Sequence, residues 1–118
     1  MEEVIVESIL TSIKKLLGIH EEYTNFDEDI IIHINTAFAT LNQLGVGPSE
    51  GFMIEDAAAE WLEYIDECNL TMVKTYIYLK VKMVFDPPTS SAVIESIKRT
   101  IDELEWRIYL IGDNSSGG

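Results

Sequence analysis

The sequence predicts an all-α protein, a compact bundle of about four to five helices with a short loop or hairpin near residues 46–54. Apolar residues recur three and four positions apart along most of the chain, which is helical spacing. Glycine or proline follows most of these runs. The 118 residues, 47% of them hydrophobic, suffice for one core without disulfides. We therefore expect a single helical domain over residues 1–112 and a flexible polar tail over residues 113–118.

The first two helices are expected over residues 2–17 and 27–44. In the first, acidic residues stand toward the start, two lysines stand near the end, and Gly18 follows as a C-terminal cap. The second begins at Asp27 and is closed by Gly45. Its run of three isoleucines would also suit a strand, but the caps and the length favour a helix.

A third helix is expected over residues 55–65, with Ala57, Ala58 and Trp61 among the residues that face inward. The next helix, over residues 70–85, is apolar over most of its circumference, which is typical of a central helix. An Asp-Pro-Pro sequence ends it, because proline cannot continue a helix.

The last helix is expected to begin at Ser90 or Ser91 and to extend to about Ile111. Its apolar residues alternate three and four apart and form a seam: Ile94, Ile97, Ile101, Leu104, Ile108 and Ile111. We expect the seam to pack on its own bundle, and the alternative is a seam shared with another subunit. The outer face holds three possible i,i+4 ion pairs: Lys98–Asp102, Arg99–Glu103 and Glu103–Arg107.

Charge is the unusual property of this sequence, with 21 acidic residues, 8 basic residues and a net charge of −13. Residues 16–73 contain twelve of the acids and no lysine or arginine. Such a chain repels phosphate, which disfavours tight nucleic-acid binding and binding to anionic membranes. A solubilising surface is the simplest interpretation, and a surface that repels or mimics nucleic acid is the alternative.

Residues capable of catalysis or metal binding do not converge in the sequence. His20 and His33 are expected to be structural or exposed, and the pair Asp29 and His33 is too small for a metal site. The single cysteine, Cys68, has no neighbouring base and fits a reducing compartment. No nucleotide-binding or hydrolase motif occurs. We therefore predict no enzyme activity, no cofactor and no metal.

Targeting signals are likewise not recognisable. The opening MEEVIVES carries acids where a signal peptide needs positive charge. Residues 30–49 have no formal charge but contain too many polar side chains and glycines for a membrane span. We therefore expect a soluble protein that is made in the cytoplasm and does not enter a membrane.

Aromatic residues near the end of the last helix are candidates for a binding surface. Trp106 lies two residues from the seam, and Tyr109 and Leu110 follow on a different face. The helix end is therefore apolar on more than one side, so one side needs a partner or a loop to cover it. Large aromatics beside Arg107 have the composition of an interface hot spot. Trp106, Arg107, Tyr109 and Leu110 are our candidate interface residues, and intrachain packing is the alternative.

The segment VKTYIYLKVKMVFDPPTSS, residues 73–91, leads into a helix that contains ELEWRI, residues 103–108. This arrangement resembles the small head–tail connector (head-completion adaptor) proteins of tailed bacteriophages. The resemblance covers residues 7–110, and its most specific part is YIYLKVK-x-x-FDPP over residues 76–88.

The resemblance implies a non-enzymatic virion protein of the neck, assembled in the host cytoplasm, that forms a ring of about twelve copies under the portal. Such a ring contacts the portal protein, neighbouring subunits and the next tail or neck component. It extends the channel through which DNA passes without specific binding. The terminal helix often makes the portal contact in this family, which corresponds loosely to Trp106, Arg107 and Tyr109.

A channel role would explain the acidity, because a tube that passes DNA should not hold it. Glu50 and Glu55 flank a glycine-rich loop that can project into a channel, so they are our candidate channel-facing acids. The alternative function is a small acidic phage protein that mimics DNA and inhibits a host nucleic-acid-binding protein. A mimic would array its carboxylates at phosphate-like spacing over one surface.

Overall fold

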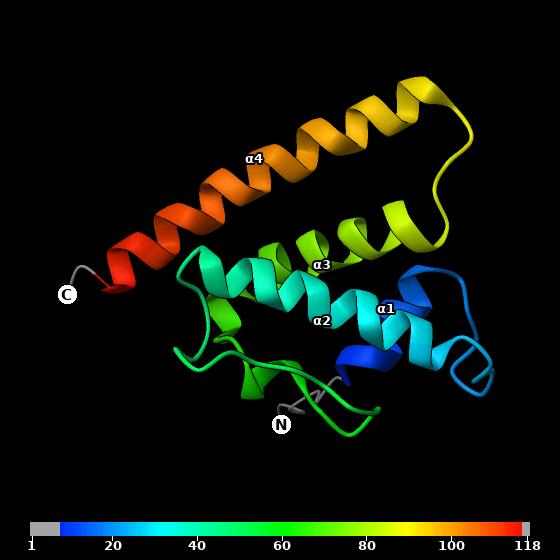
Figure 1. Ribbon diagram of the computed structural model, residues 1–118, viewed down its shortest axis with the longest axis horizontal. Helices are drawn as coiled ribbons and strands as arrows, with labels where there is room; N and C mark the ends of the chain where they lie inside the picture. The colour runs from blue at the N-terminus through cyan, green and yellow to red at the C-terminus, as the bar shows by residue number, and fades with distance from the viewer. Residues whose placement is uncertain (1–7, 117–118) are drawn as a thin grey trace, which may run out of the picture.

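The computed structural model describes residues 8–116, which fold into helices around one core (Figure 1). The elements are α1 (Ile9–Leu16), α2 (Asp27–Gln43), η1 (Trp61–Glu63), η2 (Glu67–Asn69), α3 (Leu70–Phe85) and α4 (Ser91–Ser116), where η marks a single 3₁₀ turn. Within these described residues there is no strand, only an isolated bridge between Ser8 and Glu60. The prediction of an all-α bundle is confirmed, and residues 46–54 form a loop rather than a hairpin.

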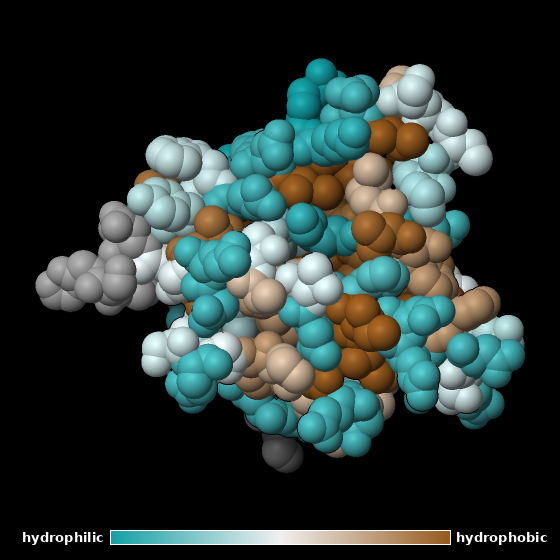
Figure 2. All heavy atoms as spheres, in the orientation of Figure 1, coloured by the Kyte–Doolittle hydropathy of each residue, from teal (hydrophilic) through white to brown (hydrophobic). Residues whose placement is uncertain are grey.

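Helix α3 is the centre of the bundle, as its apolar circumference predicted, and it contacts each of the other three α-helices. Its side chains Val73, Tyr76, Ile77 and Val81 are buried. Figure 1 shows α4 along one edge of the molecule and the loop that follows α2 along the opposite edge. Figure 2 shows apolar surface in the hollow between α4 and α2, beside a mostly polar outer face of α4.

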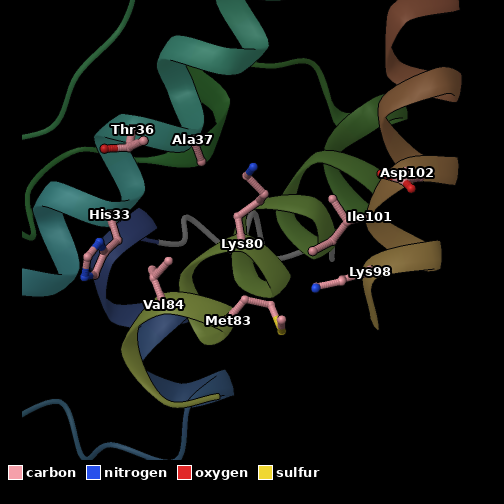
Figure 3. Close-up of a pocket in the computed structure, with 9 residues that line it drawn as sticks. All are labelled: His33, Thr36, Ala37, Lys80, Met83, Val84, Lys98, Ile101 and Asp102. Carbon is pink, nitrogen blue, oxygen red and sulfur yellow. The ribbon is translucent and has the colours of Figure 1, made fainter. Parts of the chain in front are cut away.

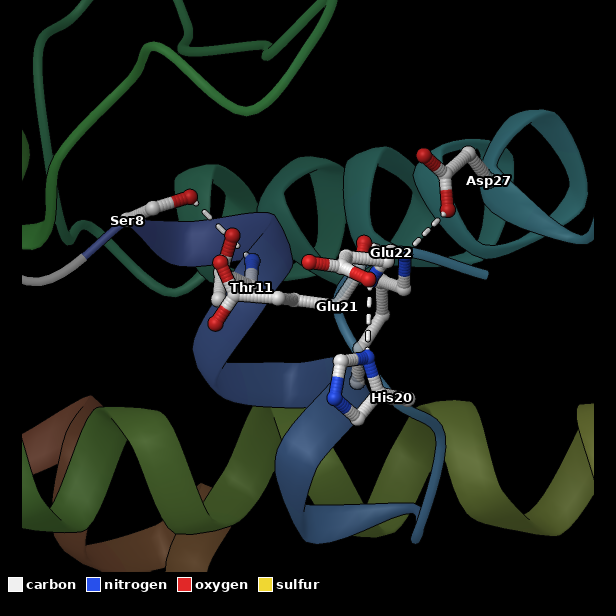
Figure 4. Close-up of polar contacts among 7 residues, drawn as sticks. Ser8, Thr11, His20, Glu21, Glu22 and Asp27 are labelled. Atoms are coloured by element: carbon white, nitrogen blue, oxygen red, sulfur yellow. Dashed lines mark hydrogen bonds and ion pairs between the residues drawn. The ribbon is translucent and has the colours of Figure 1, made fainter. Parts of the chain in front are cut away.

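Helix α1 begins at Ile9, because Ser8 caps it. The Ser8 backbone is extended, with φ −67° and ψ 134°, and its Oγ accepts the Thr11 N–H at 3.1 Å (Figure 4). Residues 2–7 of the predicted helix lie outside the described residues. At the other end Gly18 has a φ of +83°, the left-handed conformation of the predicted C-terminal cap.

Lys14 of α1 points into the protein and is only 2% exposed. Its Nζ lies 2.8 Å from Asp27 Oδ1 at the start of α2 and donates a hydrogen bond of 2.9 Å to the Glu21 carbonyl. A buried ammonium needs such partners, because leaving it unpaired away from water is costly. The ion pair therefore holds the connection between α1 and α2 against the core.

The helix predicted over residues 55–65 is wrong. Ala57 and Ala58, predicted to face inward, are exposed in a turn. The Asp56 carboxylate accepts the Ala58 N–H at 2.8 Å, a local side-chain contact that competes with helical hydrogen bonding. Regular helical structure in this segment is therefore limited to the short turn η1.

Trp61 is a core residue, as predicted, although it lies on η1 and not on an α-helix. It is 1% exposed, and its Nε1 donates a hydrogen bond of 2.7 Å to Ser12 Oγ on α1. Ser12 Oγ in turn donates to the Ile9 carbonyl at 3.1 Å. The indole thus joins the segment before α3 to the first helix.

Helix α4 packs its seam on the bundle, which confirms that prediction: Ile101 and Ile108 are buried, and Ile97 and Leu104 pack against the core. The helix runs to Ser116, five residues beyond the predicted end, and passes through Gly112. Residues 117–118 lie outside the described residues, and mobility of the tail stays a prediction.

Of the three ion pairs predicted on the outer face of α4, only the pair of Glu103 and Arg107 forms among the described residues, at 2.8 Å. Glu103 lies between Arg99 and Arg107 in the sequence and pairs with the second of them. Both partners are more than half exposed, so the pair contributes little to stability.

Candidate functional site

An exposed aromatic patch lies on the C-terminal half of α4, and we define it as Trp106, Tyr109 and Leu110. These side chains are 60%, 44% and 41% exposed. The Trp106 and Tyr109 rings stack with centroids 5.9 Å apart and an interplanar angle of 25°. The spacing of three and four residues puts all three on one side of the helix, while Ile108 between them is buried. The chain itself leaves this apolar side uncovered, the condition of a docking surface.

Arg107, the fourth predicted interface residue, is exposed but belongs to a different part of the surface. It borders a shallow depression between α3 and α4, which Cys68, Thr71 and Leu104 also line. Its guanidinium is paired with Glu103. The structure therefore brings three of the four predicted interface residues into one patch and places the arginine beside it.

The two predicted channel acids, Glu50 and Glu55, are both exposed on the long loop between α2 and η1. Glu50 lines a shallow pocket of about 520 Å³ together with Phe52 and Met53. Met53 lies between the two acids in sequence and is 70% exposed. Residues 50–55 thus present two carboxylates and one apolar side chain to solvent.

Two asparagines of α2 fix this loop, and neither belongs to the residues predicted for a site. Asn35 Nδ2 donates to the Ile54 carbonyl at 3.0 Å, and Asn35 Oδ1 accepts the Ile54 N–H at 2.8 Å. Asn42 Nδ2 donates to the Pro48 carbonyl at 2.9 Å. The contacts span up to 19 residues, so no local sequence pattern signals them. They give the loop a defined position.

A polar cluster joins α3 to α4. The Tyr76 hydroxyl donates to Glu105 Oε2 at 2.8 Å, and Lys80 Nζ lies 4.0 Å from the same oxygen. Burial raises the pKa of Tyr76 strongly, and the hydrogen bond to Glu105 and the negative charge of that carboxylate raise it further. Burial also raises the pKa of Tyr64. Burial therefore favours the protonated form of both phenols.

Metal-binding geometry is not found in the described part of the chain, where no three His, Cys, Asp or Glu side chains gather around a common point. His20 is exposed, and its Nδ1 accepts the Glu22 N–H at 3.2 Å (Figure 4). His33 is half-buried on α2 and lines a groove. Among the described residues, no helix has the length and apolar character needed to cross a membrane.

A family model described as phage connector protein matches residues 9–115, which include α1, α2, α3 and all but the last residue of α4. The chain belongs to the phage connector protein family. This membership confirms the resemblance to head–tail connectors. As a member of this family, the connector has a structural role, interacts with portal and tail components, and belongs to the virion neck. Neither a curated protein nor a solved structure matches the connector significantly.

Proposed function

We propose that the connector forms a ring of about twelve copies beneath the portal, extends the DNA channel and presents the attachment surface for the next tail or neck component. The single observation that carries the portal contact is the aromatic patch of α4. It is exposed, built on a rigid helix, and backed by a buried seam. Aromatic side chains held on a rigid element are typical of the residues that dominate protein–protein binding.

The acidic half of the chain supports the channel function. Residues 16–73 carry a net charge of −12, so about a dozen copies would surround DNA with strong negative potential. In this proposal Glu50 and Glu55 face the channel, on a loop that Asn35 holds in place. DNA then slides through without specific binding. Assembly takes place in the host cytoplasm before the tail joins.

Inhibition of a host protein by DNA mimicry is the competing function. It requires the free connector to displace DNA from a nucleic-acid-binding protein. No contact among the described residues favours it, whereas family membership supports the connector function.

Binding to DNA-filled, tailless heads of the same phage tests the portal contact. Trp106→Ala and Leu110→Ala should leave the helical circular dichroism and the melting temperature close to wild type, because both side chains are exposed. Each should weaken binding to heads by about tenfold or more, the effect expected of a hot-spot residue.

Tyr23→Ala is the matched control, since Tyr23 is an aromatic that lies outside α4 and is 47% exposed, between Leu110 and Trp106. It should bind heads like the wild type. Wild-type binding by both α4 variants would refute the assignment of the aromatic patch. Failure of the wild-type protein to bind heads would refute the connector function itself.

Charge reversal tests the channel assignment. Glu50→Lys combined with Glu55→Lys should leave ring formation intact but impair DNA retention or ejection, because cationic side chains would hold phosphate. The DNA content and the infectivity of particles assembled with this variant should be measured. Normal infectivity would show that these two acids do not face the DNA.

A further inference from the structure

A groove of about 400 Å³ lies between α2, α3 and α4, apart from the aromatic patch and the 50–55 loop. Its apolar surface comes from Ala37, Met83, Val84 and Ile101. Val84 is 61% exposed although it belongs to the central helix. This is the hollow between α4 and α2 in Figure 2.

Two lysines give the groove a positive rim in a chain of net charge −13. Figure 3 shows the Lys98 side chain reaching from α4 toward α3, and Lys80 rising from α3 between α2 and α4. Asp102 is the one carboxylate among the lining residues, and it forms no ion pair with Lys98 in the described part of the chain. Lys80 Nζ lies 4.0 Å from Glu105 Oε2 and 5.9 Å from the centre of the Tyr76 ring, over its face. The groove therefore suits an occupant that combines an apolar side chain with carboxylates.

Such an occupant is present on another surface of the same chain. We define the acidic turn as residues 62–67, which contain the last two residues of η1, the first residue of η2 and the bend between them. Leu62 is 50% exposed, and Glu63, Asp66 and Glu67 are exposed around it in sequence. No lysine or arginine occurs within this turn. An apolar side chain accompanied by three carboxylates matches the composition that the groove requires.

The groove and the acidic turn lie at opposite ends of α3. The turn leads through η2 directly into Leu70, the first residue of α3, whereas Lys80 and Val84 stand near its end at Phe85. A helix of 16 residues is about 24 Å long. The two surfaces therefore cannot meet within one copy, so any contact between them joins different copies. A contact between different patches of identical subunits generates a ring when its rotation closes.

We infer that the acidic turn of one connector subunit docks in the α2–α3–α4 groove of its neighbour. Leu62 then lies against the apolar floor, and the carboxylates of the turn face Lys80 and Lys98. This inference rests on the proposed ring. It assigns three functions to three surfaces: the aromatic patch meets the portal, the 50–55 loop faces DNA, and the groove and turn join subunits.

A charge swap tests the contact. Lys98→Glu and Glu67→Lys each change an exposed side chain, so the fold should persist. Each alone should raise the concentration needed for self-association by about tenfold, because each places like charges together. Both changes in one chain should restore self-association, and so should a mixture of the two single variants. Arg99→Glu and Glu22→Lys are matched controls that reverse an exposed charge outside the groove and the turn.

Sedimentation velocity and native mass spectrometry should follow self-association, in solution and on portal-bearing heads. If the wild type forms rings and both single variants do too, the groove assignment is wrong while the connector function stands. If the wild type forms no ring in solution or on heads, the ring itself is refuted. If Lys98→Glu loses head binding but still self-associates, the groove takes a portal segment and the inference is overturned.

Discussion

Gly112 of α4 packs directly against the Leu44 carbonyl at the end of α2, where a β-carbon on residue 112 would collide with backbone. Gly45 borders the same contact. Alanine is normally favoured over glycine inside a helix by about 0.5–1 kcal/mol. At Gly112 the collision should outweigh that gain, because overpacking costs about 1–3 kcal/mol. We therefore expect Gly112→Ala to lower the free energy of unfolding measured with urea.

Ala92→Gly provides the reference for α4, since Ala92 is exposed in the first turn. It should cost at most about 1 kcal/mol, which is the propensity difference alone. An increase in the free energy of unfolding for Gly112→Ala would mean that α4 does not pack closely against the end of α2 at this residue.

Trp61→Ala should destabilise the protein by about 3–5 kcal/mol, because it removes a large side chain that is 1% exposed. Ser12→Ala tests the hydrogen bond separately. It leaves the buried indole N–H without its acceptor and should cost about 1–3 kcal/mol. Thermal and urea unfolding measure both values. A melting temperature near wild type for Trp61→Ala would show that the indole is not part of the core.

Asp27→Ala should destabilise the protein by about 3 kcal/mol, because it leaves the Lys14 ammonium, which is 2% exposed, without its ion-pair partner. Lys14→Met should cost much less, since it replaces the charge with an apolar side chain of similar length. Urea unfolding of the two variants side by side measures the difference. If both variants lose the same free energy of unfolding, the unpaired Lys14 charge is not the cause of the loss.

Alkaline pH should destabilise the connector through Tyr64 and Tyr76. Their folded-state pKa values lie above the ordinary tyrosine value, so the unfolded chain releases protons first as the pH rises past about 10. Stability is fully present below that pH and falls above it. Tyr64→Phe combined with Tyr76→Phe should flatten this fall, as followed by urea unfolding across the alkaline range. An unchanged slope would exclude these phenols as the cause.

Asn35→Ala should loosen the 50–55 loop more than it weakens the bundle. It leaves the backbone N–H and carbonyl of Ile54, which is 2% exposed, without partners. Hydrogen exchange at residues 51–57 should accelerate while α3 stays protected. Asn35→Asp keeps the acceptor and loses the donor, so it should give an intermediate rate. If the loop amides of Asn35→Ala exchange at the wild-type rate, contacts other than the Asn35 hydrogen bonds hold the loop.

Sequence periodicity predicted the helices that carry both a regular apolar face and clear end signals. The bounds predicted for residues 70–85 match α3, and those for residues 27–44 match α2 to within one residue. Residues 55–65 show similar spacing but form a turn, because the Asp56 side chain accepts the Ala58 N–H and the capping box of Glu60 and Glu63 begins a helical turn only at Trp61. A periodic pattern alone does not reveal that competition.

Among the candidate surfaces, too, those built by a single helix could be predicted and those built by several elements could not. Exposure of Trp106 and Tyr109 follows from their position relative to the seam, which one helix determines locally. The groove was not predicted, because its lysines and its apolar floor come from three different helices, and periodicity within one helix does not show how helices pack. The role of Asn35 was missed because its partner lies 19 residues away.

The hydrogen bond between Trp61 and Ser12 spans 49 residues, which has a consequence for synthesis on the ribosome. Translation proceeds at about 5–20 residues per second, so α1 leaves the ribosome several seconds before Trp61. During that interval Ile9 and Ile13 lack the partners that follow in the chain. Ser12 therefore waits seconds for the indole that it binds, and α1 completes its packing only after η1 has been made.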